Sequence, residues 1–399
     1  MHAKLSSNFA SIELRDFQKS APLSAKFEAM KRKSGNGNSS SDGASLSKKR
    51  KITFFAGANV PRPQVVYNMK VDNSYSTPFV PRLTRKPNAS VTSLQESIKP
   101  MAHQNVITNS GYPAGPSHFY PHPYQHEIEN FEVPLDFLEK DESNLHSPPT
   151  IDNLPAPEII ETRVQLEALI EVLRTKREIA VDLEHHSFRS YQGITSLMQI
   201  STDEHDYIVD VFRLWNDAEA LNEIFTSPSI LKVFHGAEYD VIWLQRDLGL
   251  YLVNLFDTAI AAKLLNYPKL SLMNLVAKFC DVQLDKRFQL ADWRIRPLPE
   301  EMVNYARLDT RFLLYIYRCL KRELLEQSDE SANLLRVVMD KSRDLCLKVS
   351  FTEFITNYNL YFLYSYTYRD MKKNYSNRVI ILRWCGSLIS NSTPANWKH

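Results

Sequence analysis

Two acidic residues follow an apolar run in the stretch "IAVDLEHHSF" at residues 179–188. Side chains of an extended strand alternate between its faces, so Asp182 and Glu184 point the same way while Val181 and Leu183 face the opposite layer. Two unpaired carboxylates on one face repel each other and require a cation, either an Arg or Lys partner or a metal ion. Hard oxygen donors without Cys or clustered His suit Mg²⁺ or Mn²⁺ better than Zn²⁺. The alternative, a strand that ends in solvent at Glu184, is the commoner case for an isolated Asp-x-Glu.

Three further residues follow in order along the same segment and favour the metal hypothesis. Asp240 falls in the first turn of a predicted helix, where its side chain can project over the end of a sheet. Tyr305 and Asp309 are four residues apart on a later predicted helix and therefore share one face. Each has an ordinary alternative, because the helix dipole favours an acid at a helix start and a Tyr–Asp pair can be an exposed polar pair. Their occurrence together with Asp182 and Glu184 weakens those alternatives.

The elements that position these residues begin at about residue 159, where dense apolar periodicity starts. The pattern predicts a helix with Thr162 as its N-cap, a strand ending at Glu184, and two more strands that complete an antiparallel meander. A fourth strand is broken by Gly236. The predicted strands cover residues 178–184, 196–203, 205–212 and 230–236.

Helices are predicted from apolar spacing at residues 162–175, 217–227, 238–249, 257–266, 271–280 and 299–324. Gly249 ends one of them, and Asp257 and Ser271 are expected N-caps. Pro299 precedes the last, a single long helix with acids in its first turn. A strand meander followed by alternating helices and strands predicts an α/β fold with a mixed sheet.

Composition gives only broad limits. A chain of 399 residues with 43% hydrophobic residues can bury a core and hold two or three domains. The net charge of +2 is no evidence for or against nucleic acid. The cysteines show no CxxC pairing, which fits a reducing compartment and supports neither a disulfide framework nor a zinc site. Neither a signal peptide nor an apolar run of about 18 residues is found, so a soluble intracellular protein is expected.

The first third of the chain has a different character. Residues 1–55 form a basic, Ser- and Gly-rich segment that is predicted to be disordered. Its "KKRK" at Lys48–Lys51 fits a nuclear localisation signal or a solvated charge run equally well. Residues 56–158 are punctuated by prolines, and their aromatic residues without periodicity suggest an extended lead-in that packs on the domain that follows it.

Four motifs in this order, "VDLEHHS", "VFHGAEYDVIWLQ", "QLADWRIRPLPEEM" and "YARLDT", resemble those of the DEDD-Y exonucleases, the RNase D-like branch of the ribonuclease H-like superfamily. The similarity is strongest to the nuclear exosome exoribonucleases, and "RPQVVYNMKVDNSYSTPFVPRL" and "HPYQHEIENF" resemble their lead-in segment. The close match covers residues 159–348, and the exonuclease domain is expected at 159–325. For residues 326–399 the resemblance implies a helical remnant and a divergent, tyrosine-rich tail in place of a complete HRDC domain.

The resemblance implies a catalytic site and a substrate. Asp182, Glu184, Asp240 and Asp309 would hold two Mg²⁺ ions, with Mn²⁺ as a substitute, and Tyr305 would orient the attacking water. The implied activity shortens single-stranded RNA from its 3′ end and releases nucleoside 5′-monophosphates during RNA processing and decay. The implied partner is the nuclear RNA exosome core, in the nucleus and nucleolus.

Four other residues are candidates for RNA contact. His185 is a rim residue or a packed histidine, and Trp243 can stack on a base or pack in the core. Within "DKRFQLADWRIRP", Lys286 and Arg294 lie among basic and aromatic residues as in a single-strand groove, although Arg294 can instead pair with a helix-start acid.

Two alternatives to an RNA exonuclease remain. One is a truncated, catalytically weak or inactive isoform that binds RNA or docks on the exosome, because the helical domains that usually flank the exonuclease are not recognisable. The other is a DNA-proofreading exonuclease, which shares the chemistry.

Overall fold

The computed structural model describes residues 79–90, 93–102, 118–138, 147–150, 155–186, 193–289, 291–329 and 332–349, together with residues 60 and 63. All of them belong to the second of two units, Phe54–His399, and the first unit is Met1–Thr53. The predictions for the basic segment, its "KKRK" and the chain after residue 349 therefore fall outside the described residues.

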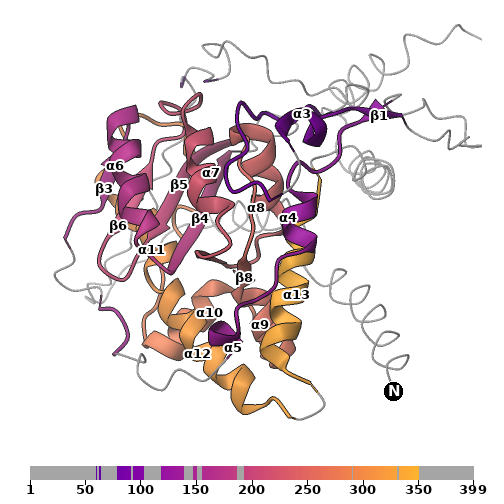
Figure 1. Cartoon of the computed structure of the whole chain (residues 1–399). Helices are drawn as coiled ribbons and strands as arrows, with labels where there is room; N and C mark the ends of the chain where they lie inside the picture. Colours follow the sequence, from indigo (N-terminus) through magenta and orange to yellow (C-terminus); the bar gives the residue numbers. More distant parts are fainter. Residues whose placement is uncertain are drawn as a thin grey trace, which may run out of the picture. The chain divides into compact units, whose positions relative to one another are not determined.

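A mixed sheet of six strands forms the centre of the fold, in the order β3-β6-β5-β4-β7-β8 (Figure 1). Its strands are β3 Glu158–Ile160, β4 Glu178–His186, β5 Ile194–Ser201, β6 Asp206–Val209, β7 Leu231–Phe234 and β8 Leu255–Asp257. Strands β4, β5 and β6 form the predicted antiparallel meander, whereas β3, β7 and β8 each run parallel to a neighbour. The predicted α/β fold with a mixed sheet is confirmed.

Helices of the exonuclease segment follow most of the predicted positions. They are α6 Arg163–Arg174, α7 Asn222–Phe225, α8 Glu238–Trp243, α9 Thr258–Leu264, α10 Leu272–Cys280, α11 Glu300–Arg311, α12 Leu313–Glu326 and α13 Leu334–Cys346. A 3₁₀ turn, η2 Ala218–Leu221, precedes α7, and a π-helical turn, η3 Leu244–Leu248, continues α8 to Gly249. Thr162 caps α6 with a reciprocal capping box, and Asp257 caps α9.

The single long helix predicted for residues 299–324 is wrong. It breaks at Phe312, whose ring is fully buried and whose backbone (φ −92°, ψ −9°) ends α11 and starts α12. The break lets α11 lie along β5 and β6 while α12 packs on α9 and α10. Apolar periodicity alone continues through both helices, so it does not reveal the change of direction.

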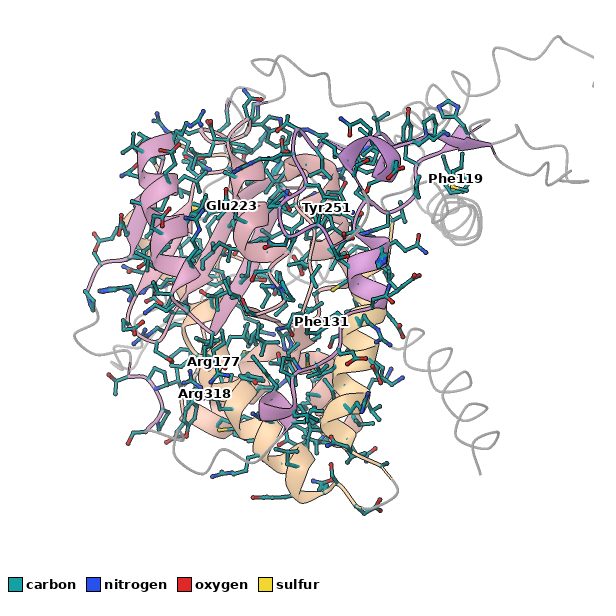
Figure 2. The ribbon with its side chains drawn as sticks, viewed as in Figure 1. Phe119, Phe131, Arg177, Glu223, Tyr251 and Arg318 are labelled. Atoms are coloured by element: carbon teal, nitrogen blue, oxygen red, sulfur yellow. The ribbon has the colours of Figure 1, made fainter. Side chains whose placement is uncertain are left out.

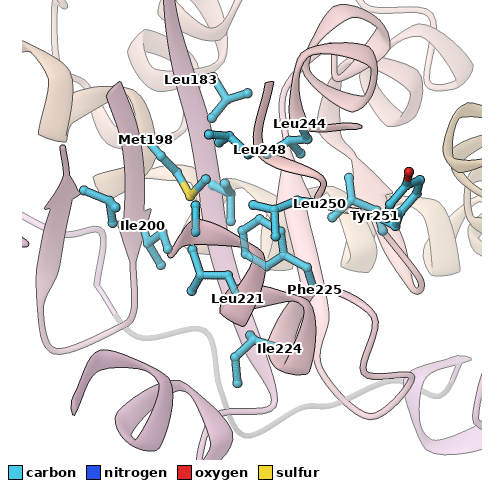
Figure 3. Packing of buried hydrophobic residues seen from close by; sticks show 14 of the residues in the cluster. Leu183, Met198, Ile200, Leu221, Ile224, Phe225, Leu244, Leu248, Leu250 and Tyr251 are labelled. Atoms are coloured by element: carbon cyan, nitrogen blue, oxygen red, sulfur yellow. The ribbon is translucent and has the colours of Figure 1, made fainter. Parts of the chain in front are cut away.

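The two faces of the sheet carry separate apolar cores. On one face, Val181 and Leu183 of β4 pack with residues of α6, α7 and the α8–η3 segment, and Figure 3 shows this packing around Phe225 and Leu244. On the other face, Ala180 packs with α9, α10, α12 and α13. Alternation along β4 therefore directs Asp182 and Glu184 to the face of Ala180, which α11 and α12 cover.

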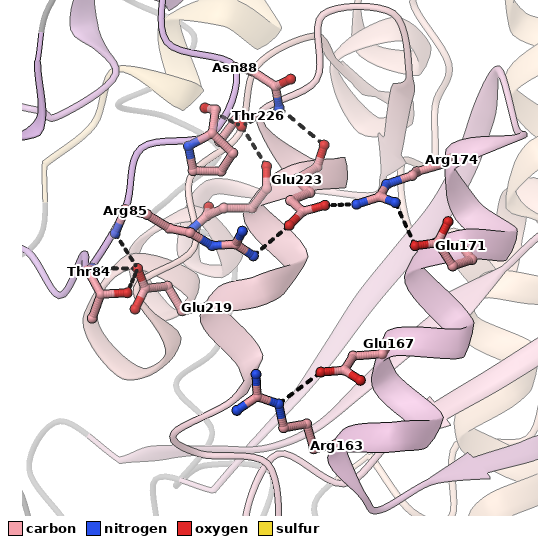
Figure 4. A network of polar contacts seen from close by, with 12 residues as sticks. Thr84, Arg85, Asn88, Arg163, Glu167, Glu171, Arg174, Glu219, Glu223 and Thr226 are labelled. Carbon is pink, nitrogen blue, oxygen red and sulfur yellow. Dashed lines mark hydrogen bonds and ion pairs between the residues drawn. The ribbon is translucent and has the colours of Figure 1, made fainter.

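Parts of the lead-in lie against the exonuclease segment. They contain the short elements α3 Leu94–Ser97, β1 Met101–Ala102, β2 His118–Phe119, α4 Gln125–Glu129 and α5 Leu135–Leu138. The backbone amide of Thr84 donates to Glu219, the guanidinium of Arg85 pairs with Glu223, and the side-chain amide of Asn88 donates to Thr226 (Figure 4).

A buried ion pair within the lead-in lies beside an aromatic contact that reaches the exonuclease segment. Lys86 Nζ lies 2.9 Å from Glu127 Oε1, and both side chains are almost fully buried. The ring of Tyr124 packs against Tyr251, 5.5 Å between centroids, and Tyr251 (labelled in Figure 2) is itself buried. Residues 79–90 and α4 thus pack against the segment between η2 and β8.

Two further sequence features have a structural outcome. Cys280, Cys319 and Cys346 are buried free thiols. No helix in the described part of the chain has the length and apolar character needed to cross a lipid bilayer.

Candidate active site

Asp182 and Glu184 lie on β4 beyond the point where its hydrogen-bonded pairing with β7 ends. The pairing of β4 with β7 covers only Glu178–Ala180, whereas its pairing with β5 continues to His186. Beyond Ala180, β4 therefore has no neighbour on the β7 side, and the chain after β7 turns away into α8. The two carboxylates lie beside this opening at the carboxyl ends of the parallel strands, where α/β sheets commonly bind ligands.

Helix α8 brings Asp240 to the same opening. Gly236 makes the turn after β7 with φ +72°, a conformation that favours glycine. The carboxylate of Asp257, at the end of β8, accepts hydrogen bonds from the backbone amides of Gly236 and Ala237 (2.9 and 2.8 Å) while it caps α9. Asp257 thereby holds the turn that starts α8. Asp240 follows in the first turn of α8 and is buried.

Helix α11 supplies Tyr305 and Asp309 and is locked onto the sheet. Arg307 forms a buried ion pair with Asp206 of β6, 2.6 Å between Nη2 and Oδ2. The hydroxyl of Thr310 is 2.7 Å from that of Ser201 in β5. These contacts fix the rotation of α11, so the face of Tyr305 and Asp309 turns toward β4.

The four carboxylates act on one another electrostatically. Burial raises the pKa of Asp182 to about 7. Burial also raises the pKa of Glu184, and the charges of Asp309, Asp182 and Asp240 raise it further. Burial and the charge of Asp182 raise the pKa of Asp240 and of Asp309. The structure thus brings together all four acids of the sequence-based hypothesis.

No Lys or Arg within the described residues forms an ion pair with Asp182, Glu184, Asp240 or Asp309. The polar neighbour of the group is Gln199, fully buried in β5 opposite Asp182, whose amide donates to Glu184 Oε1 at 3.5 Å. Buried carboxylates without a protein cation fit divalent ions, since these supply the missing positive charge and accept hard oxygen ligands. As the side chains stand, no group of three His, Cys, Asp or Glu residues in the described part of the chain is arranged to hold a metal.

Tyr305 and Asp309 line a common cavity. The ring of Tyr305 packs edge-on against Phe288, 5.7 Å between centroids, and burial together with the nearby Asp309 raises the pKa of its phenol. The cavity, about 250 Å³, extends from Asp309 and Tyr305 to Arg287 and Phe288. It is open space directly beside the carboxylate group and the phenol.

His185 and Trp243 lie together at the rim of this group. A bulge lies between Glu184 and His185, and His185 contacts the α8–η3 segment, which also packs on Val181 and Leu183. Its imidazole lies flat on the indole of Trp243, with centroids 3.9 Å apart and planes 3° apart. Trp243 is half-buried at the edge of the core. This position is intermediate between the two alternatives proposed from the sequence, which are stacking on a base and packing in the core.

The basic residues near the site differ in their availability to a ligand. Lys286 is exposed, and Arg287 pairs with Asp285. Arg294 makes a two-point ion pair with Asp292 (2.8 and 2.8 Å), so its structural partner is not the helix-start acid suggested from the sequence. Arg296 is held by Asp210 and by backbone carbonyls, which gives it a structural role.

Comparisons with known proteins agree with this geometry. A family described as 3′–5′ exonuclease matches residues 157–325. Exosome complex component 10 of Rattus norvegicus is 42% identical over 335 residues, which cover 80% of this chain and 37% of the relative. Exosome complex exonuclease RRP6 of Saccharomyces cerevisiae is 44% identical over 314 residues, which cover 77% of this chain and 40% of the relative.

A solved structure extends the comparison to the fold. The crystal structure of the catalytic core of RRP6 from Trypanosoma brucei is similar with a TM-score of 0.60 and 41% identity, and the match covers 72% of each chain. The present chain spans 37% to 40% of the length of the two curated relatives. The resemblance noted in the sequence is confirmed, and the chain belongs to the RNase D-like branch of the DEDD family of 3′–5′ exonucleases.

Proposed function

We propose that this chain is a 3′-to-5′ exoribonuclease that acts with the nuclear RNA exosome on single-stranded RNA and releases nucleoside 5′-monophosphates. The observation that carries the proposal is the group of four carboxylates that raise one another's pKa with no Lys or Arg partner in the described residues, next to Tyr305. The family generally uses divalent metal ions, and two Mg²⁺ ions, or Mn²⁺, fit this donor set.

In this proposal the chain's own residues hold and orient the reactants. Asp182, Glu184, Asp240 and Asp309 hold the ions. When bound, divalent ions supply the charge that lowers the pKa of the attacking water and neutralises the leaving 3′ oxygen. Tyr305 hydrogen-bonds the attacking water and orients it in line with the phosphate. Its raised pKa keeps the phenol protonated near neutral pH, so it acts by positioning rather than as a base.

Its RNA specificity, exosome partner and nuclear and nucleolar location are proposed from the relatives, since two of them carry exosome in their names. Substrate contacts are proposed at the rim: His185 and Trp243 beside the acids, and Lys286 on the exposed loop before Phe288. Arg294 is proposed to hold this loop through Asp292 more than to touch RNA.

The direct test incubates purified protein with 5′-labelled single-stranded RNA and DNA of the same sequence, with Mg²⁺, Mn²⁺ or EDTA. We expect a ladder that shortens from the 3′ end of RNA, with nucleoside 5′-monophosphate as product and no reaction in EDTA. Shortening of DNA alone would support a proofreading exonuclease. Binding of RNA without shortening would support the non-catalytic isoform.

The site assignment is tested by Asp240→Asn, which removes one negative charge from the carboxylate group. Turnover should be abolished while RNA binding and the melting curve persist. Glu238→Gln is the matched control, because Glu238 is an exposed acid in the first turn of the same helix. Near wild-type turnover in Asp240→Asn with an unchanged melting curve would make Asp240 an ordinary helix-start acid.

A further inference from the structure

Three aromatic rings, from His185 on β4 and from Trp243 and Tyr239 on α8, stack on one another. His185 lies on Trp243 at 3.9 Å, and Tyr239, one turn before Trp243 on α8, lies near-parallel to the indole, with centroids 5.8 Å apart and planes 25° apart. The stack runs from the half-buried His185 and Trp243 to Tyr239, which is 52% exposed. Tyr239 is the only aromatic residue among the exposed large hydrophobic side chains of the described chain.

This stack is attached to two of the four acids. His185 directly follows Glu184 on β4, and Tyr239 directly precedes Asp240 on α8. Any displacement of the rings relative to the acids would require β4 or α8 to move. The stack is therefore joined through the backbone to two of the four acids, and its contact with Trp243 orients the exposed ring of Tyr239.

The inner end of the stack is held on two more sides. Gly193 has φ +64°, and a Cβ there would lie 2.1 Å from His185 Cε1, so the glycine backbone closes against the imidazole edge. Arg246 Nη2 lies 3.3 Å from His185 Nε2 and donates to it, since a guanidinium has no acceptor. Arg246 is in turn paired with the buried Asp247. An imidazole so enclosed provides a rigid base for the rings above it.

We propose that Tyr239 is an RNA-binding residue, on which a base of the single strand stacks as the 3′ end enters the carboxylate site. The inference rests on the proposed function and adds a binding position to it. Aromatic side chains bind single strands by stacking with bases of any sequence. His185 already covers one face of the Trp243 indole, so the exposed ring of the stack is the surface that a base meets.

The test measures RNA affinity by fluorescence anisotropy of a labelled 12-nucleotide RNA in EDTA. Tyr239→Ala should raise Kd about 5- to 150-fold, which corresponds to the roughly 1–3 kcal/mol of one base–aromatic stack at 1.4 kcal/mol per tenfold. Tyr239→Phe and Tyr239→Trp should stay near the wild type, since both keep a ring. Val172→Ala on α6 is the control, an apolar side chain that is also exposed.

A second measurement identifies the stacked base. RNAs with one abasic position each are bound to the wild type and to Tyr239→Ala. At one position the abasic RNA should weaken wild-type binding but not that of Tyr239→Ala, because both changes remove the same stack. In hydrolysis assays with Mg²⁺ the loss should fall on KM rather than on kcat.

The outcomes separate this inference from the proposed function. If the wild type shortens RNA and Tyr239→Ala binds every abasic RNA as the wild type does, Tyr239 is not a binding residue and the proposed function stands. If the wild type neither binds nor shortens RNA, both are wrong. A loss in Tyr239→Ala that Phe and Trp do not restore would mean that the phenol hydroxyl, and not ring stacking, makes the contact.

Discussion

Burial gives each residue of the carboxylate group its distinctive chemistry. Asp182 is half-buried and Asp240 is nearly fully buried. In place of a Lys or Arg partner, the group has one hydrogen bond, from the side-chain amide of Gln199 to Glu184. Charges that cannot be hydrated or paired take up protons unless a metal ion is present. At the residue scale, affinity for divalent cations and proton binding are therefore competing ways to neutralise the same oxygens.

Replacement of Tyr305 by Phe tests the positioning role. The change deletes only the hydroxyl and keeps the packing of the ring on Phe288. Turnover should fall about 10- to 1000-fold, the range for one positioned hydrogen bond or acid–base group, while RNA affinity and the Mg²⁺ concentration for half-maximal activity stay nearly constant. Asp309→Asn should instead weaken Mg²⁺ binding. A fully active Tyr305→Phe would make the tyrosine a packing residue of α11.

The raised pKa of Asp182 predicts a pH-dependent stability. Between its ordinary value of 3.8 and about 7, the folded protein keeps the proton that the unfolded chain has lost. Stability in EDTA should therefore fall as pH rises through this window. Asp182→Asn abolishes this titration, so in EDTA it should raise Tm over the wild type at pH 8, by roughly 2–8 °C, and change it little at pH 5. Melting curves at both pH values provide the test, and an equal difference at both would contradict it.

At the scale of elements, the helices and the meander were predictable because their patterns are local. Thr162 and Asp257 sit where caps were expected, and Gly249 ends the segment that contains α8. Strands β3 and β8 were missed, since three residues are too few to show alternation. The break at Phe312 was missed because tertiary packing, not local sequence, decides the direction of α12.

The sequence allowed a prediction of the acids that make up the candidate site, but not of the residues that hold them in place. The order of acids along the chain and the family resemblance proposed Asp182, Glu184, Asp240 and Asp309, while Gln199 belongs to no motif and is recognised only through the β4–β5 register. Asp257 was recognised as a cap, but its second role in holding Gly236 depends on a contact across the β7–β8 edge. Such long-range contacts leave no periodic signal in a single sequence.

The lead-in contains a buried ion pair between Lys86 and Glu127, and its contribution to stability can be tested at the same scale. Lys86→Met leaves the Glu127 carboxylate buried without its cation, which should cost about 3–5 kcal/mol of unfolding free energy. Lys86→Met with Glu127→Gln should recover much of this loss, because the amide oxygen can still accept from the Ser90 backbone amide.

Arg163→Met is the matched control for the buried pair. Arg163 pairs with Glu167 on α6, where both side chains are largely exposed to solvent, so its loss should leave the free energy of unfolding nearly unchanged. Urea denaturation of the single and double variants gives the free energies. Equal costs for the buried and the exposed pair would show that the lead-in does not depend on Lys86.

At the scale of the whole molecule, the proposed site and its support all lie between residues 79 and 349. The lead-in contributes packing through Thr84, Lys86 and Tyr124, and the acids and the aromatic stack belong to the exonuclease segment. We therefore expect catalysis to depend on residues 79–349 and nuclear localisation to depend on the basic N-terminal segment.

A deletion of Met1–Thr53 separates the two. The proposed site and its supporting contacts lie in the second unit, so the shortened protein should keep kcat/KM on single-stranded RNA within about twofold and the same Mg²⁺ requirement. Its fluorescent fusion should leave the nucleus, because Lys48–Lys51 is removed. Replacement of Lys48–Lys51 by alanines in the full chain should reproduce the relocation without affecting turnover. Unchanged nuclear accumulation in both variants would reduce the basic run to a solvated charge segment, and a large loss of turnover in the deletion would place part of the catalytic machinery before residue 54.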